Sequence, residues 1–330
     1  YQAGPKSVTL SYDKSAAIVV MPPVGGGRLR DRKLRRWLAQ SMLERLAEPR
    51  ELLGDILDLL GMQCPQEGLA AMRMWGQTGD RPTVWISAAD PVYLEPRLDH
   101  ICLHALRQTG IPASELRTLF DHLQRTLAED KGYGFARLGT YGYLRAEDAM
   151  VTAALPAYVI DQQCPGDYMP GGDRAAEFRN LLSEIEMALH EHPVNVERQL
   201  QGLQPVNSLW LWGGGHAPEP RTVPHPPLYA DDPLLRGYWE SVTGVVDTWP
   251  GTIDACLDAS IAGFVAVTPE FDDDIELLES CLHELRSALQ SGRLSQLTLM
   301  FGDGIRATVR QNDNYRFWRR DSALLSASAQ

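Results

Sequence analysis

The segment Pro205 to His216 (PVNSLWLWGGGH) constrains the fold more than any other part of the chain. Ser208 to Trp212 is a continuous apolar run, which predicts a strand covered on both faces. Glycines 213 to 215 follow it, and glycine alone allows both positive φ and close approach of the backbone to a ligand. In an open α/β sheet, ligands bind outside the carboxyl ends of the strands. We therefore expect these glycines to form a turn that lines a binding site.

The C-terminal third alternates between strand and helix patterns. Gly263 to Val267 and Leu297 to Phe301 are apolar strand candidates, and Asp272 to Leu289 is an amphipathic helix candidate between them. Leu297 to Val309 predicts a hairpin that turns at residues 302 to 304. This alternation predicts an α/β fold with a mixed or mostly parallel sheet and flanking helices.

The beginning of the chain predicts one short strand followed by helices. Ser15 to Met21 is the strand candidate, and prolines and glycines end it. Asp31 to Ala47 and Pro49 to Leu60 are both amphipathic, which predicts an α-rich N-terminal part. The Pro- and Gly-containing loop Asp161 to Asp173 is the expected boundary between two lobes. We expect an α+β lobe over residues 1–165 and an α/β lobe over residues 166–330 that carries the glycine strand.

The middle of the chain mixes strand and helix signals. Thr83 to Ser87 and Leu98 to His104 are strand candidates, and the intervening Ala89 to Pro96 is turn-rich. Ser114 is the expected N-cap of a helix that runs to Leu127, and Phe135 to Arg145 predicts a strand or hairpin. Further helices are expected from a cap at Asp173 to about His190, from Pro193, and from Asp232 to Ser241.

The charge balance argues against a general nucleic-acid surface, since the formal net charge is -12. The basic segment Arg28 to Arg36 is the exception. At helical spacing it gives an apolar face (Leu29, Leu34, Trp37, Leu38 and Met42), so we interpret its charges as a solvated helix face. Five cysteines without a CxxC spacing favour reduced thiols. No apolar run is long enough to span a bilayer, and we expect a cytoplasmic protein without a membrane contact.

The histidines and aspartates suggest sites but do not define one. His100 and His104 would share a helix face, but HICLH is strand-like, and this spacing on one strand separates them too far for one ion. His190 and His192 lie at a helix end, which favours a capping role. Asp303 lies in the predicted hairpin turn, where a structural role is more common than a catalytic one.

Ala188 to Gly215 resembles the RpfE-type regulatory proteins of proteobacteria. The residues that carry the resemblance are His190, His192, Pro193 and Asn195, followed by the PVNSLWLWGGG segment. The resemblance extends to ADPVYL (Ala89 to Leu94), to LYADDPLLRG (Leu228 to Gly237) and to the terminal RFWRR. The resemblance covers the chain from about residue 80 onward.

That family is related to cofactor-independent phosphoglycerate mutase, so the resemblance implies an alkaline-phosphatase-like α/β core. Those mutases use two divalent metals held by Asp and His, and a Ser or Thr nucleophile at the end of the first strand. Here the first strand candidate ends in MPPVGGG, which offers neither an Asp ligand nor a hydroxyl nucleophile. The resemblance therefore implies the scaffold more directly than the mutase reaction.

We expect a non-catalytic regulatory protein that binds a small phosphorylated metabolite or a protein partner and needs no cofactor. Its expected binding residues are Asn207, Ser208, Trp210, Trp212, Gly213, Gly214, Gly215, His216, His192 and Asn195. The alternative is a metal-dependent phosphotransferase or phosphatase that acts on a small phosphorylated metabolite with manganese or zinc. Its candidate ligands are Asp90, Asp231, Asp232, His216 and His225. A third possibility is an interaction protein that works through Arg28 to Arg36 or Tyr315 to Arg320.

Overall fold

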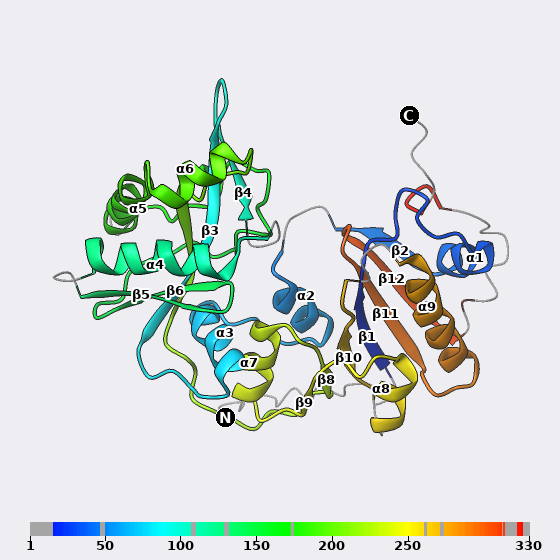
Figure 1. The fold of residues 1–330 in the computed structure, drawn as a ribbon. Helices are drawn as coiled ribbons and strands as arrows, with labels where there is room; N and C mark the ends of the chain where they lie inside the picture. Colours follow the sequence, from blue (N-terminus) through cyan, green and yellow to red (C-terminus); the bar gives the residue numbers. More distant parts are fainter. Residues whose placement is uncertain are drawn as a thin grey trace.

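A large sheet and a small sheet organise the computed structural model (Figure 1). The structure describes residues 16–46, 50–106, 110–128, 132–172, 175–260, 263–270, 274–311, 313 and 322–325. In the large sheet the strand order is β2-β12-β11-β1-β10-β8-β9. Its strands are β1 (Ala16–Met21), β2 (Met42–Arg45), β8 (Leu228–Tyr229), β9 (Val246–Asp247), β10 (Val265–Val267), β11 (Gln296–Phe301) and β12 (Ile305–Arg310). From β11 to β9 all neighbours are parallel, and β12 and β2 add an antiparallel edge, which confirms the predicted mixed, mostly parallel α/β sheet.

The small sheet is antiparallel throughout its described pairs. Its strands are β3 (Trp85–Pro96), β4 (Ile101–Ala105), β5 (Tyr133–Leu138), β6 (Tyr141–Ala146) and β7 (Ser208–Gly215). The long strand β3 is its centre, because it pairs with β4, β6 and β7. Each sheet takes strands from both sides of residue 165, so the predicted lobes 1–165 and 166–330 do not coincide with the sheets.

Helices form three layers around the two sheets (Figure 1). The outer face of the large sheet is covered by α1 (Arg32–Gln40), α8 (Ile253–Ala259) and α9 (Ile275–Gln290). Between the sheets lie α2 (Leu52–Leu59), α3 (Leu69–Thr78) and α7 (Pro233–Ser241). Beyond the small sheet lie α4 (Ala113–Leu127), α5 (Ala175–Leu189) and α6 (Pro193–Leu200), and a 3-10 helix spans Pro165–Tyr168. Within the described residues, none of the helices has the length and apolar character needed to span a bilayer.

Strand β7 is buried on both faces, as its continuous apolar sequence predicts. Trp210 and Trp212 point into the core between the two sheets, whereas Leu209 and Leu211 point into the core beneath α4 and α5. Successive side chains of a strand alternate between faces, so a strand between two cores has to be apolar at every position.

The predicted glycine turn is wrong, because Gly213 to Gly215 continue β7 and Gly215 pairs with Ile86 of β3. These glycines do not lie at the carboxyl edge of the parallel sheet. A Cβ at Gly214 would come within 2.6 Å of the Trp85 ring, and one at Gly215 would overlap the backbone of Gly68. The glycines therefore allow the start of α3 to pack directly on the strand.

The predicted turn over Ala89 to Pro96 is also wrong, since β3 runs through it. Pairing with β6 stops at Ala88 and pairing with β4 begins at Val92, whereas β7 pairs along the other edge. At Pro91 the strand therefore has a neighbour on one side only. A proline fits there because its missing N–H removes no ladder hydrogen bond.

Several helix predictions need smaller corrections. The helix expected over Asp31 to Ala47 ends at Gln40, where Ser41 caps it, and β2 follows with Met42 exposed rather than on the apolar face. Helix α4 begins at Ala113 after Pro112, so Ser114 is not its N-cap. The hairpin β11–β12 and the Asp232 cap of α7 are confirmed. The predicted helix ends at Ala47 and Pro49, the Asp173 cap, the Asp272 start and the tail Tyr315 to Arg320 lie outside the described residues.

Candidate functional site

A cleft of about 650 Å³ opens at the carboxyl ends of β1, β10 and β11, where the large sheet meets the segment after β6. Side chains from distant parts of the chain line it: Val20, Leu46, Arg50, Leu52, Asp55, Tyr158, Val159, Gln163, Asp232, Glu270, Met300, Phe301, Ile305 and Arg306. Parallel strands end here together, which is the usual location of ligand sites in open α/β sheets. The cleft is therefore the candidate functional site.

Two arginines and three carboxylates line the cleft, and Asp55 is the carboxylate on which both arginines have an electrostatic effect. Arg50 Nη1 lies 2.8 Å from Asp58 Oδ2 and 3.9 Å from Asp55 Oδ1, and Arg306 Nε lies 2.6 Å from Glu44 Oε1. Burial raises the pKa of Asp55, and the charges of Arg50 and Arg306 oppose that shift. Both guanidinium groups line the same cleft, so an anionic ligand there could bind to both.

Glu51 is a buried carboxyl group beside the cleft. Its Oε2 accepts the Gly54 N–H at 3.1 Å as the N-cap of α2, and its Oε1 accepts the Tyr158 hydroxyl at 3.3 Å. Burial raises the pKa of Glu51 to about 7, and the negative charge of Asp232 adds to the shift. A carboxyl group that titrates near neutral pH can exchange protons with a ligand, which makes Glu51 a candidate acid or base.

Replacing this carboxyl group by an amide, Glu51→Gln, is expected to stabilise the protein most at high pH. Below pH 4.5 the carboxyl group is protonated whether the chain is folded or unfolded, so its charge costs nothing. Between pH 4.5 and about 7 the unfolded chain loses a proton that the folded chain keeps, and the cost of burying the charge grows until it is complete. The amide accepts the helix N–H less strongly than the carboxylate, which offsets part of the cost of charge burial that the substitution removes. The expected net gain above that pH is about 2 kcal/mol.

Urea unfolding measured from pH 4 to pH 8 checks this gain, with the exposed Glu67→Gln as control. A pH-independent difference for Glu51→Gln would contradict the assignment.

Asp303 supports the loop after β1 rather than the cleft. Its Oδ2 accepts the N–H groups of Val24 at 3.2 Å and Gly25 at 2.6 Å, and Oδ1 is buried without a described partner. This is consistent with the structural role that its place in the β11–β12 turn predicts. Asp303 ties that turn to the end of the first strand.

The carboxylates of the cleft do not fit a metal centre of the mutase type. Such a centre needs three or more oxygen or nitrogen ligands that converge on each ion. In the part of the chain that the structure describes, one group of three His, Cys, Asp or Glu side chains converges in this way, and it lies on the β3–β4 hairpin. We therefore derive no chemical step through a metal in the cleft.

The tryptophans and polar residues of β7 are occupied by internal hydrogen bonds. Trp210 Nε1 donates to the Leu155 carbonyl at 2.8 Å, and Trp212 Nε1 donates to Asp90 Oδ2 at 2.6 Å. Asn207 bridges to the Leu94 backbone through both of its amide atoms, and Ser208 donates to Glu186. These contacts anchor β7 in the small sheet.

His192 and Asn195 have similar structural contacts. His192 Nδ1 accepts the Val194 N–H at 3.3 Å and caps α6, and Asn195 binds the backbones of Leu189 and Val206. His216 is exposed and follows the last glycine. None of the predicted binding residues is among those that line the cleft, so their role in binding stays a prediction.

The candidate metal ligands are separated. Asp90 is buried in the small sheet against Arg73, whereas Asp232 lines the cleft and caps α7. Asp231 is exposed, and His225 contacts the Val223 carbonyl and the Tyr238 hydroxyl. Of these candidates, Asp232 is the residue that the structure places in the cleft.

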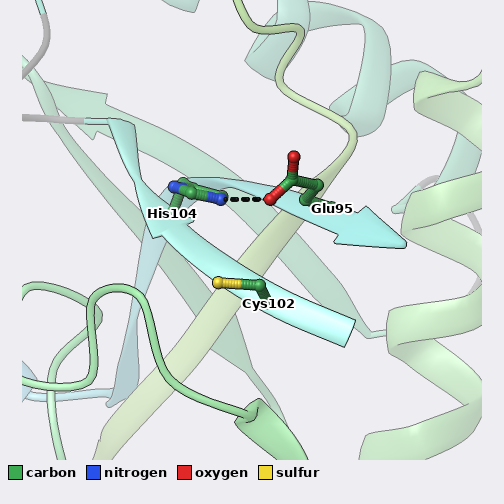
Figure 2. Close-up of side chains that lie close together, drawn as sticks. All are labelled: Glu95, Cys102 and His104. Carbon is green, nitrogen blue, oxygen red and sulfur yellow. Dashed lines mark hydrogen bonds and ion pairs between the residues drawn. The ribbon is translucent and has the colours of Figure 1, made fainter. Parts of the chain in front are cut away.

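The β3–β4 hairpin brings together Glu95, Cys102 and His104, a group that the sequence pattern did not indicate (Figure 2). The spacing of His100 and His104 on one strand had argued against a metal at this place. The hairpin instead pairs Glu95 with Cys102 across β3 and β4. A turn at residues 98–100 between two strands would have been the signal for this pairing.

Comparison with known proteins gives a partial match. No protein-family model matches the chain. A 2,3-bisphosphoglycerate-independent phosphoglycerate mutase of Methanosarcina acetivorans is 33% identical over 118 residues, which is 34% of this chain and 29% of that protein. A probable enzyme of the same name from Geobacter sulfurreducens is 26% identical over 51% of this chain and 46% of that protein. The chain is similar in sequence to cofactor-independent phosphoglycerate mutases.

The match is limited in extent. The chain spans less than a third of the length of the methanogen mutases that it matches first. A solved cofactor-independent phosphoglycerate mutase from Thermoplasma acidophilum superposes with a TM-score of 0.43 at 19% identity, over 96% of this chain and 95% of that one. A structure from Pyrococcus horikoshii gives a TM-score of 0.48 at 13% identity, over 91% and 90%. Both named sequence relatives are mutases, so the RpfE-type assignment stays a prediction.

Proposed function

We propose that the chain binds a small phosphorylated metabolite in the cleft between the two sheets. The observation that carries the proposal is that Arg50 and Arg306 line one cleft at the carboxyl edge of the parallel strands. Guanidinium groups suit phosphate and carboxylate oxygens, and this edge is where α/β sheets bind ligands. The sequence relatives are named for phosphoglycerate, so a phosphorylated three-carbon acid is the ligand class to test first.

The relatives also favour a second candidate, phosphoryl transfer to or from that ligand. Glu51 would then exchange a proton with the substrate from its position behind Tyr158. A regulatory binding role and phosphoryl transfer need the same occupied cleft, and a conversion assay of phosphoglycerate isomers with manganese or zinc separates them.

Removing one of the two cations, Arg306→Ala, is expected to weaken binding of 3-phosphoglycerate by about 10- to 100-fold. A hydrogen bond to a charged group contributes about 1.5–3 kcal/mol, and each 1.4 kcal/mol is a factor of ten. Isothermal titration measures the change. The control is Arg310→Ala, four residues further along β12, where the guanidinium binds Gln296 outside the cleft. Equal losses in both variants, or no binding to the wild type, would contradict the proposal.

Asp55→Asn separates the two candidate functions. If the cleft only binds the phosphorylated acid, the variant removes a competing negative charge from the lining that Asp55 shares with the arginines, and binding becomes several-fold tighter. If phosphoryl transfer in the cleft needs the Asp55 carboxylate, turnover in the conversion assay falls instead. Titration and the conversion assay on the same preparation distinguish these results.

A further inference from the structure

The β3–β4 hairpin places a carboxylate, a thiol and an imidazole on one face. Glu95 and Cys102 are direct partners in the antiparallel register, and His104 follows Cys102 by two residues, so the three side chains project from the same side. Figure 2 shows them together on the hairpin. One ligand atom from each lies within 4.8 Å of the others. This spread allows all three atoms to reach one ion.

The ligand atoms are already aimed at one another. His104 Nε2 lies 3.0 Å from Glu95 Oε2, and Arg97 Nε donates to the same oxygen at 3.0 Å. The carboxylate has a second oxygen, so Glu95 could bind an ion through one oxygen and keep Arg97 on the other. At the hairpin tip, by contrast, His100 pairs with Asp99 at 2.6 Å. Among the described residues, these two do not belong to a group of three converging metal ligands.

The surroundings hold the three residues in place. The Tyr93 ring stacks on His104 with a centroid separation of 5.8 Å. The backbone of Leu103, between Cys102 and His104, exchanges hydrogen bonds with Gln162 and Gln163. Cys102 is 1% exposed, whereas the side chains of His104 and Glu95 are 19% and 37% exposed. The group is thus fixed by the sheet on one side and open to solvent on the other.

We propose that Glu95, Cys102 and His104 form a zinc-binding site, independent of the function proposed for the cleft. Thiolate and imidazole ligands select zinc over magnesium or calcium, and three protein ligands leave a fourth position for water or another ligand. Binding replaces the His104–Glu95 hydrogen bond and releases the thiol proton of Cys102. Without the thiol of Cys102, Glu95 and His104 would form only a surface ion pair.

Cobalt substitution tests the site directly. Adding one equivalent of Co²⁺ to the full chain is expected to give a tetrahedral d–d spectrum together with a thiolate-to-cobalt absorption in the near ultraviolet. Zinc is expected to displace the cobalt and remove both signals. Cys102→Ser is expected to abolish the thiolate absorption and to weaken zinc binding by more than about 100-fold. The failure of the wild type to bind cobalt or zinc at micromolar concentration would overturn the site.

Matched variants keep the test specific. His104→Ala and Glu95→Gln are expected to weaken zinc binding, whereas Cys164→Ser and His100→Ala, which lie outside the group, are expected to leave it unchanged. Glu95→Gln keeps the size of a half-exposed side chain, so it remains informative if the substitution of buried Cys102 prevents folding. A thiolate absorption that persists in Cys102→Ser, or that is lost in Cys164→Ser, would assign the metal to another cysteine.

Discussion

Replacing Asp90 by alanine is expected to lower the free energy of unfolding by about 3–5 kcal/mol. Asp90 lies in the core between the sheets, where its Oδ1 binds Arg73 Nη1 at 2.8 Å and its Oδ2 accepts from Trp212 Nε1 at 2.6 Å. Both charged side chains are about 5% exposed or less. Without the carboxylate, the positive charge of Arg73 would be buried and unpaired.

The rest of the network cannot replace the carboxylate. Arg73 also donates to the Tyr143 hydroxyl at 3.2 Å and to the Gly142 carbonyl at 2.9 Å. Its Cζ atom lies 4.7 Å from the centre of the Tyr143 ring and 5.2 Å from the centre of the Trp212 ring. These neutral groups satisfy its N–H donors but bring no negative charge. The buried pair therefore orders the small sheet against α3, and its loss leaves the cost of a desolvated cation.

Urea unfolding of the full chain measures the effect. Asp90→Asn, which keeps acceptor capacity for Trp212 but removes the charge, is expected to give an intermediate loss. The control is Asp258→Ala, because Asp258 pairs with Arg293 on the surface, where the two side chains are 75% and 40% exposed. Exposed pairs contribute about 1 kcal/mol or less. Similar small losses in Asp90→Ala and Asp258→Ala would show that the buried pair is not needed for stability.

The sequence predicts strands β1, β10, β11 and β12 of the large sheet because their patterns are local, whereas β2 lies in a segment predicted to be helical. β1, β11, β12 and α9 each carry an apolar periodicity that continues in one segment, and the Asp232 cap is visible next to Pro233. The order of the strands is not local, since β1 pairs with β10 and β11 from the far end of the chain. For the same reason the division into sheets does not follow the division of the sequence into halves.

The errors come from residues whose usual preference is overridden by partners elsewhere. Asp90 and Pro91 have turn character, yet a buried arginine and a missing neighbour strand place them inside β3. The glycines of β7 have the character of a ligand turn, yet close packing on the start of α3 explains them. The cleft could not be predicted, because Arg50, Asp55 and Arg306 meet only through the tertiary fold.

The crossing of α3 and α7 gives the second large expected effect, since it depends on two glycines. A Cβ at Gly237 would overlap the Met72 carbonyl, and one at Gly76 would overlap the Pro233 carbonyl. Backbone atoms within a helix cannot move aside as a flexible side chain can. Gly237→Ala is therefore expected to lower the free energy of unfolding by more than about 3 kcal/mol, at the upper end of the overpacking range.

A second helical glycine makes the comparison decisive, because helix propensity alone predicts the opposite result for Gly237→Ala. Alanine favours a helix over glycine by about 1 kcal/mol. At Gly54 in α2 a Cβ would meet only the Cys64 sulfur at 3.8 Å, an ordinary contact, so Gly54→Ala is expected to stabilise the protein by about 0.5–1 kcal/mol. Unfolding curves of the two variants should therefore shift in opposite directions. A shift of Gly237→Ala in the same direction as Gly54→Ala would contradict this packing. The two helices would then have to lie further apart than the structure places them, and the packing that joins the two sheets would need another explanation.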